Sequence, residues 1–393
     1  MSDKPDILIA GAGIAGLTAA LALARRGFGS TIVESFSEPS EVGAGLQVAP
    51  NASRILRDLG VLDALREKAV APSSIRLGDA PTGRILLDMA ITPEWLEKMG
   101  APYLTAHRAS LHGVLYRAAL ADPAIDIVTG ERVTGVSQDT DSVTVTLETG
   151  DDGKRDLVCG VLIGADGIWS RTRSAISGAA DPKPTGRIAW RAIGPASAAS
   201  ANKVTAWMAP DSHLVTYPVR NSETLNIVAI THGRLEAHDW SHEADQGQLS
   251  RLLESARKIT DLGHVEKANW TTWPLNAVSP SAPWHDGRVV LIGDAAHGLE
   301  PFAAQGAAMA IEDGYALGIA FAKHGGTPEE AFRHYRSLRI DRILRVARRT
   351  EFNRWTYHQS GAGRVARNMF FSMRSADAFF GDLDWLYGYR FEA

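Results

Sequence analysis

The stretch ILIAGAGIAGLTAALALARRGFGSTIVE, residues 7–34, decides the fold. Residues 6–10 are mostly apolar and are followed by glycines, which predicts a buried strand. Residues 14–26 carry apolar groups at helical spacing and end in a basic turn before Gly27, which is typical of a helix C-terminus. Residues 30–34 predict a second strand, so the stretch forms one strand–helix–strand unit with parallel strands.

Glycines in this unit follow the spacing G-x-G-x-x-G between the first strand and the helix. Gly11 permits the tight turn, Gly13 lets a pyrophosphate approach the backbone, and Gly16 lets helix and strand pack closely. The helix N-terminus offers its free N–H groups to the phosphates. Glu34 ends the second strand, where a carboxylate can bind the hydroxyls of a ribose. The unit therefore predicts a dinucleotide site, without distinguishing NAD from FAD.

Two later segments each deliver an aspartate from an apolar strand into a glycine turn. They are CGVLIGADGIWSRTRS at 159–174, with Asp166, and RVVLIGDAAHGLEPFAAQG at 288–306, with Asp294. Taken singly, each aspartate is better interpreted as a cap of its own loop. Together with the first turn, they predict one long ligand lying across a parallel sheet, and FAD is such a ligand.

In this arrangement the ADP half of FAD uses the first turn, and Asp294 accepts hydrogen bonds from the ribityl chain. A long helix with many small residues is predicted over 303–323. Its first N–H groups, near Gly306 and Ala307, would face the N1/C2=O edge of the flavin. A helix N-terminus stabilises the negative charge that develops there on reduction.

The composition is that of an ordinary globular protein: 393 residues, 45% hydrophobic, 22% charged, with a net charge of -4. This mild acidity argues against a nucleic-acid partner. One cysteine, Cys159, excludes an internal disulfide and favours a reducing compartment. No apolar run reaches the roughly 20 residues of a membrane-spanning helix. We therefore expect a cytoplasmic protein without a membrane anchor.

The predicted fold class is α/β, with a Rossmann-like FAD-binding domain of the glutathione-reductase type. Residues 182–280 change to short apolar–polar alternation, which predicts an inserted antiparallel sheet that forms the substrate domain, with one helix near 245–260. The expected divisions are an FAD-binding domain at 1–181, with small substrate-side insertions near 70–105, the inserted sheet at 182–280, the second part of the FAD-binding domain at 281–325, and a helical C-terminal segment at 326–393.

The motifs G-A-G-I-A-G…E, G-A-D-G-I-W-S-x-x-R and G-D-A-A-H-x-x-x-P-x-x-x-Q-G resemble those of the class A, single-component flavoprotein aromatic hydroxylases. The chain is most similar to the salicylate hydroxylase and 3-hydroxybenzoate 6-hydroxylase branch. The resemblance extends to residues 42–60, 107–112 and 384–389. One departure is Gly298, where relatives usually have proline, and it is expected to loosen the turn near the flavin.

The resemblance implies a monooxygenase that keeps FAD bound while NADH or NADPH visits without a Rossmann site of its own. Reduced flavin and O2 would form a C4a-hydroperoxyflavin, which hydroxylates a phenolic aromatic acid. Arg108 would contact the FAD phosphate or ribityl region, Gln47 the flavin and Val133 the adenine, and Asp166 and Arg173 would organise the FAD and NAD(P)H surfaces. The full expected cofactor set is Gly11, Gly13, Ala15, Gly16, Glu34, Gln47, Arg108, Val133, Asp166, Asp294, Gly306 and Ala307.

The expected catalytic residues lie in DSHLVTYPVR, residues 211–220, and in the loop after the third motif. In a strand, His213 and Tyr217 share one face. The resemblance implies that His213 and Gln305 hydrogen-bond the phenol oxygen, with His213 as base. Tyr217 would orient the substrate and Pro301 would shape the cavity. The alternative for His213 is a buried structural histidine.

Several points stay open at this stage. Salicylate, 3-hydroxybenzoate and a hydroxypyridine carboxylic acid are all compatible substrates, and hydroxylation with or without decarboxylation is possible. A flavoprotein oxidoreductase without oxygen insertion is the alternative activity. Arg191 or Arg220 could pair with a substrate carboxylate. The pair His238 and His242 lacks a third ligand, so no metal is expected. The preference for NADH or NADPH is open, as is the choice between monomer and homodimer.

Overall fold

The computed structural model describes residues 6–37, 45–150, 153–197, 200, 202–220, 222, 224–233, 242–243, 253–254, 258–259 and 269–391. Most of the helix expected near 245–260 lies outside the described residues, as do the side chains of His238 and His242. Among the described residues, no helix is both long enough and apolar enough to cross a membrane.

A six-stranded sheet carries all three glycine turns. Its order is β19 (His285–Asp286), β20 (Val289–Leu291), β12 (Val161–Gly164), β1 (Ile7–Ala10), β2 (Ser30–Glu34) and β8 (Ile125–Thr129). All neighbours are parallel except the β19–β20 pair. Because β20, β12 and β1 are adjacent and parallel, the turns that follow them lie at one edge of the sheet. This is the arrangement that one extended ligand requires, and the predicted fold class is confirmed.

Two helices beside this sheet pack against each other at unusually close range. α1 (Ile14–Ala24) packs on α8 (Gly306–His324). A Cβ on Gly314 would lie 2.6 Å from the backbone nitrogen of Ala19, and one on Gly318 would lie 2.8 Å from the carbonyl oxygen of Ala22. The small residues of the sequence thus serve helix contact as well as ligand approach.

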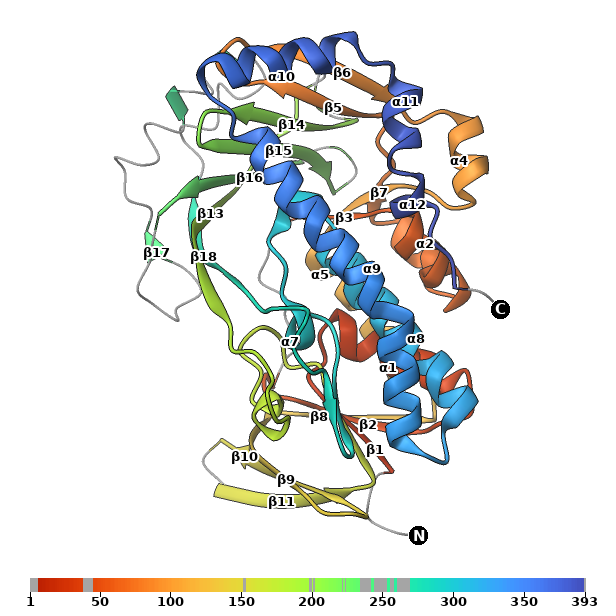
Figure 1. Ribbon diagram of the computed structural model, residues 1–393. Helices are drawn as coiled ribbons and strands as arrows, with labels where there is room; N and C mark the ends of the chain where they lie inside the picture. Colours follow the sequence, from red (N-terminus) through yellow and green to blue (C-terminus); the bar gives the residue numbers. More distant parts are fainter. Residues whose placement is uncertain are drawn as a thin grey trace.

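A second, eight-stranded sheet forms the other lobe, at the top of Figure 1. Its order is β17 (His242–Glu243), β18 (Thr271–Ala277), β13 (Lys183–Pro195), β16 (Thr224–His232), β15 (Ser212–Val219), β14 (Lys203–Ala209), β5 (Ser74–Asp79) and β6 (Arg84–Ala90). Only β14–β5 is parallel among its pairs. The sheet is therefore larger than the predicted insertion, because it takes β5 and β6 from residues 74–90.

The two faces of this sheet pack differently. On β15, Val215, Tyr217 and Val219 contact the main core, which is continuous with the first lobe. Leu214 instead packs with Trp190 in a separate cluster on the opposite face. His213 and Tyr217 thus share the face that looks toward the first lobe, as the two-residue period of a strand predicts.

Smaller elements complete the fold. Two three-stranded sheets are β3 (Gly45–Val48), β7 (Leu104–His107) and β4 (Ala69–Val70), and β11 (Gly153–Cys159), β10 (Val143–Thr149) and β9 (Glu131–Gln138). The remaining helical elements are α2 (Pro50–Asp58), α3 (Leu62–Arg66), α4 (Pro93–Met99), α5 (Arg108–Leu120), η1 (Thr172–Ala175), α7 (Asp294–His297), η4 (Pro301–Ala303), α9 (Pro328–Tyr357), α10 (Gly361–Met373), α11 (Ala376–Gly381) and α12 (Asp384–Tyr387). In Figure 1 the long α9 runs from the first lobe to the second sheet.

A buried ionic cluster joins α8 to α9. Arg339 of α9 donates from Nε to Asp313 Oδ1 at 2.7 Å and also pairs with Glu312. Arg342 donates to both oxygens of Glu312, at 2.8 and 2.9 Å. Both carboxylates are 0% exposed, so each depends on these partners for its charge to be tolerated.

Replacing Arg339 by Met should lower the free energy of unfolding by about 3–5 kcal/mol, because two buried carboxylates lose one of their guanidinium partners. Urea unfolding of both proteins measures the difference. Arg333→Met, at an exposed position of the same helix, is the matched control and should change the value by less than about 0.5 kcal/mol. An Arg339→Met protein as stable as the wild type would contradict the role given to the cluster.

Candidate active site

The first turn has the shape that a pyrophosphate needs. Gly11 has φ +103°, and a Cβ there would lie 2.6 Å from the carbonyl oxygen of Ala165. A Cβ on Gly16 would lie 2.0 Å from the carbonyl oxygen of Gly11, so both positions require glycine. A Cβ on Gly13 would meet no atom within 4 Å. Gly13 therefore borders open space next to the N-terminus of α1, where phosphate oxygens can reach the backbone N–H groups.

Glu34 at the end of β2 closes this turn. Its Oε2 accepts the Ala12 N–H at 2.8 Å, and its Oε1 accepts hydrogen bonds from Ser35 and Phe36. A carboxylate offers about four acceptor positions, so Oε2 can still accept a ribose hydroxyl. Ala15 is buried in α1 and packs under the third turn, where a Cβ on Gly293 would lie 3.0 Å from the Ala15 methyl.

The second turn is held by its own aspartate. Asp166 Oδ2 accepts the backbone N–H groups of Arg171 and Thr172 at 2.8 and 3.0 Å. The buried Oδ1 has no hydrogen-bond partner. Asp166 thus caps the η1 turn, the local role that a single strand-end aspartate was expected to have, while its backbone lies against Gly11.

Arg173 connects the second turn to the third. Its guanidinium donates to the carbonyl oxygens of Ala295, at 2.9 and 3.0 Å, and of Ile168, at 2.9 Å. This arginine is buried and therefore fixes the distance between the two turns. Its expected part in organising the FAD and NAD(P)H surfaces remains a prediction.

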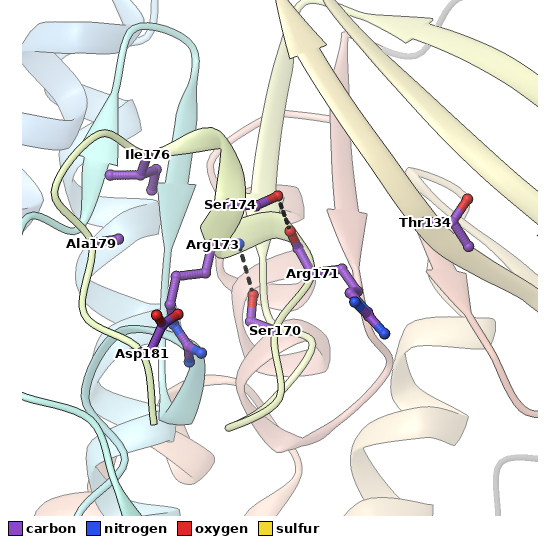
Figure 2. Close-up of a pocket in the computed structure, with 8 residues that line it drawn as sticks. All are labelled: Thr134, Ser170, Arg171, Arg173, Ser174, Ile176, Ala179 and Asp181. Atoms are coloured by element: carbon purple, nitrogen blue, oxygen red, sulfur yellow. Dashed lines mark hydrogen bonds between the residues drawn. The ribbon is translucent and has the colours of Figure 1, made fainter. Parts of the chain in front are cut away.

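A polar pocket of about 320 Å³ lies beside this segment (Figure 2). Its lining residues are Thr134, Ser170, Arg171, Arg173, Ser174, Ile176, Ala179 and Asp181. Ser170 Oγ accepts the Arg173 N–H at 3.0 Å, and Ser174 donates to the Arg171 carbonyl at 2.8 Å. None of the expected catalytic residues lines this pocket.

The third turn brings Asp294 toward Arg108. Both side chains are exposed, yet desolvation by the surrounding protein raises the pKa of the Asp294 carboxyl and lowers the pKa of Arg108. Their charges oppose these shifts, since Arg108 favours ionised Asp294 and Asp294 favours charged Arg108. A side chain that solvent reaches while protein atoms surround it lies on a concave surface. Such a surface suits the ribityl and phosphate region of FAD.

The helix after the third turn starts later than predicted. Residues 301–303 form the short η4 turn, and α8 begins at Gly306 instead of 303. Ala304 adopts a left-handed conformation at φ 51°, which ends η4 and prevents a continuous helix. Gly306 is exposed, and a Cβ there would meet no atom within 4 Å. The N–H groups at Gly306 and Ala307 thus begin a 19-residue helix at an open position.

Gly298, the departure from the usual proline, has φ -58° and ψ 114°. This φ is close to the value that proline imposes. Its carbonyl accepts the Val278 N–H at 2.9 Å. The glycine thus keeps a backbone conformation that proline would also adopt, and the expected loosening of the turn remains a prediction.

The remaining expected cofactor residues lie between the lobes or in the core. Gln47 on β3 accepts a hydrogen bond from the Tyr103 hydroxyl. Val133 on β9 is buried in the main core. Their contacts with the flavin and the adenine remain predictions.

His213 is 2% exposed and lies in an aromatic cluster. Its ring centroid is 4.9 Å from that of Phe302 in η4 and 5.4 Å from that of Tyr357 in α9. Its Nδ1 lies 3.0 Å from Nε2 of His358. Burial, together with His358, lowers the pKa of His213 well below its ordinary value. The imidazole is therefore neutral at neutral pH, with one unprotonated ring nitrogen.

Tyr217 does not present a free hydroxyl. Its O–H donates to the carbonyl oxygen of Gly45 at 2.6 Å, and burial raises its pKa. Gly45 N–H in turn donates to Asn226 Oδ1. Tyr217 thus links β15 to β3, and it can meet a ligand only with its ring and its oxygen lone pairs. Pro301 is exposed at the start of η4, and its shaping of the cavity remains a prediction.

Gln305 has a partner that sequence reasoning missed. Its Oε1 accepts a hydrogen bond from Asn51 Nδ2 at 3.1 Å, and the same Nδ2 donates to Glu312 at 2.7 Å. Asn51 stands at the start of α2, far away in sequence, and only its place in NASRILRDLG could have drawn attention to it. Because the amide oxygen is engaged, the Nε2 group of Gln305 remains as the donor for a ligand.

Arg191 on β13 shares the sheet face of His213 and Tyr217. It pairs with Val228 of β16, which pairs with Val215 of β15, the residue between His213 and Tyr217. Arg220, the other candidate, is exposed in the turn after β15, with φ 50°.

The Arg191 guanidinium stacks over the ring of Trp273, 4.6 Å from its centroid. Its buried Nε has no hydrogen-bond partner, and it forms no ion pair with a carboxylate of the described residues. Burial lowers the pKa of Arg191, and the ionisable groups that act on it are Tyr217 and Arg108. Among the side chains that the structure describes, Arg191 therefore has no counter-ion, and the flavin site is expected close to it.

The FAD binding domain family matches residues 4–350 of this chain. The 3-hydroxybenzoate 6-hydroxylase of Klebsiella oxytoca is 33% identical over 398 residues, covering 99% of this chain and 98% of that protein. The 6-hydroxynicotinate 3-monooxygenase of Pseudomonas fluorescens is 31% identical over 363 residues, covering 90% and 92%. A solved substrate complex of salicylate hydroxylase has a TM-score of 0.77 at 22% identity, covering 99% of this chain and 97% of that one.

The open space at Gly13 and Gly306, the acid at the end of β2, and the opposite charges of Asp294 and Arg108 all fit FAD. With the family match over most of the chain, they establish that this protein belongs to the class A, FAD-binding flavoprotein monooxygenases and is an FAD-dependent aromatic hydroxylase with NAD(P)H as cosubstrate.

Proposed function

We propose that the enzyme hydroxylates a phenolic aromatic acid of the 3-hydroxybenzoate or salicylate type. The observation that carries the proposal is Arg191, a half-buried guanidinium that has no counter-ion among the described side chains and lies on the sheet face that also holds His213. An arginine in such a place binds a carboxylate by two charge-assisted hydrogen bonds. Substrate binding would thus supply the missing negative charge.

The positions of Arg191 and His213 favour a substrate whose carboxylate and hydroxyl are well separated on the ring. Arg191 and His213 lie on β13 and β15, with β16 between them. At about 4.8 Å per strand, the backbones are about 10 Å apart. A carboxylate and a hydroxyl in the meta arrangement span more of this distance than the same groups in the ortho arrangement. In the ortho arrangement the two groups hydrogen-bond to each other. This argument supports a 3-hydroxybenzoate-like acid over salicylate.

When bound and reduced, the flavin supplies an electrophilic oxygen from O2, which attacks an electron-rich ring best. The residues of this chain make the ring electron-rich. Neutral His213 accepts the phenolic proton, and the Gln305 Nε2 group donates to the oxygen that becomes negative. Tyr217 and Phe302 close the cavity with apolar surface, which excludes water from the reacting centre.

A hydroxypyridine carboxylic acid is the second candidate. It presents the same acid and a similar ring hydroxyl to Arg191 and His213. The 6-hydroxynicotinate 3-monooxygenase of Pseudomonas fluorescens matches over 90% of this chain, which favours including such acids. The relatives that match are named as hydroxylases and monooxygenases, which argues against an oxidoreductase without oxygen insertion.

Substrate-stimulated NADH oxidation, with O2 uptake and product identification, tests the proposed function. A panel of 2-, 3- and 4-hydroxybenzoate with 6-hydroxynicotinate should give at least one hydroxylated product in amounts equal to the NADH consumed. We expect 3-hydroxybenzoate to be the best of these. NADH oxidation that yields only hydrogen peroxide with every acid would overturn the proposal.

Arg191→Met should raise KM for the preferred acid by about 10–100-fold, because charge-assisted hydrogen bonds contribute about 1.5–3 kcal/mol. The same variant should leave KM for the neutral amide of that acid nearly unchanged. Steady-state kinetics with both compounds measures the effect. Arg220→Met, which removes an exposed arginine of the same lobe, is the matched control. Equal losses for acid and amide would contradict carboxylate binding by Arg191.

His213→Asn should slow hydroxylation by about 10²–10⁴-fold, the usual contribution of a general base. Retention of FAD should be unchanged, since His213 contacts Phe302, Tyr357 and His358 rather than the dinucleotide turn. Single-turnover hydroxylation and flavin content after gel filtration measure the two effects. A variant that loses flavin, and hydroxylates at the wild-type rate once refilled, would show that the histidine is structural.

A further inference from the structure

We propose that His358 relays the phenolic proton from His213 to solvent, so that the proton leaves the closed cavity through a pair of histidines. The inference deepens the proposed function and rests on it, because it takes His213 as the acceptor of that proton. His358 follows the last residue of α9, and neither the motifs nor the resemblance pointed to it.

Contact geometry supports the relay. His213 Nδ1 and His358 Nε2 are 3.0 Å apart, which is hydrogen-bond distance. The ring centroids are 5.2 Å apart, and Phe302 lies against both rings. A hydrogen bond through Nδ1 leaves Nε2 of His213 as the nitrogen that can accept a proton from substrate.

The solvent exposure of the side chain increases from His213 through His358 to His232. His213 is 2% exposed, His358 is half-buried, and His232 at the end of β16 is exposed. The rings of His358 and His232 have centroids 6.0 Å apart. A base as buried as His213 has no direct path to water, so its proton needs a second group, and His358 is the ring nitrogen hydrogen-bonded to it.

The charges around His358 disfavour its protonated form. Burial and these charges lower its pKa to about 4. The titratable and charged groups that face it are His213, His232, Arg187 of β13, Arg354 of its own helix and Arg367 of α10. The C-terminus of α9 stabilises a passing positive charge, as helix C-termini do. His358 thus transmits a proton without retaining it.

The transfer balances as follows. The phenol O–H bond breaks and its proton binds Nε2 of His213, while the electron pair stays on the phenolate oxygen. The Nδ1 proton of His213 passes to Nε2 of His358, and the Nδ1 proton of His358 leaves to water or to His232. Each ring ends neutral, in its other tautomer. Return of a proton to the hydroxylated product along the reverse route restores both tautomers, and nothing is oxidised or reduced.

Anaerobic stopped-flow mixing of the FAD-loaded enzyme with 3-hydroxybenzoate tests the relay. In weakly buffered solution with a pH indicator, phenolate absorbance and proton release should rise together in the wild type. His358→Phe keeps an aromatic ring against Phe302 but has no nitrogen. It should slow both signals at least about 100-fold, the lower end of the usual contribution of a proton-transfer group. Added imidazole should restore the rate in proportion to its concentration.

His334→Phe is the matched control, because His334 lies on the same helix with its ring against His324 and away from the cavity. It should release the proton at the wild-type rate. Wild-type proton release in His358→Phe would overturn the relay. A slow rate that imidazole leaves unchanged would also overturn it, because it would assign His358 a packing role alone.

A measurement without substrate separates this inference from the proposed function. In FAD-loaded enzyme with ¹⁵N-labelled histidine, NMR should detect one shared proton between the two rings and a His358 that stays neutral to about pH 4. His213→Asn should abolish the shared proton. If the wild type binds none of the acids but keeps this signal, the proposed function fails and the pair stands. A His358 that titrates as an isolated histidine overturns the relay itself.

Discussion

The structure depends on one buried ionic cluster, formed by Glu312 and Asp313 of α8 with Arg339 and Arg342 of α9. Asp313 also accepts the Gly293 N–H at 2.9 Å and binds His297 at 2.6 Å, so it fixes both ends of the third glycine turn. Glu312 holds Asn51, which in turn holds Gln305. The cluster therefore sets the backbone and one side chain at the reactive end of the flavin site. Arg342 extends it to the carbonyl oxygens of Trp385 and Leu386 near the C-terminus.

Local sequence patterns predicted the parts of this site that depend on local backbone geometry. Gly11 and Asp294 follow the ends of β1 and β20, and Gly16 lies in the first turn of α1. A short motif determines the backbone at each position, which explains why Gly11 and Gly16 must be glycine and why Asp294 lies close to Arg108. The strand period placed His213 and Tyr217 on one face. By contrast, the start of α8 was predicted too early, because the left-handed residue Ala304 has no distinctive local signal.

The parts that could not be predicted depend on contacts between distant segments. Asn51 meets Gln305 across 254 positions, and His213 meets His358 across 145. Strands β5 and β6 join the inserted sheet through the parallel pair β14–β5, which no alternation pattern at 74–90 reveals. Tyr217 has the expected orientation, yet its hydroxyl is engaged by Gly45, a partner that only the folded chain provides. Such pairings are set by packing of whole elements, so a motif cannot encode them.

The two lobes accommodate their charged groups in different ways. The first lobe neutralises its buried charges internally, since Glu312 and Asp313 both have arginine partners and their pKa values are lowered despite burial. In the second lobe, Arg191 has no counter-ion among the described side chains, and burial keeps His213 uncharged. An unpaired buried cation carries an unfavourable desolvation cost that only a bound anion relieves. Under the proposed function, the sheet favours an acid through the charge of Arg191, while the neutral His213 takes a second proton from the same molecule. In that proposal, recognition and activation act on opposite ends of one substrate, and the ionic cluster holds the third glycine turn beside them.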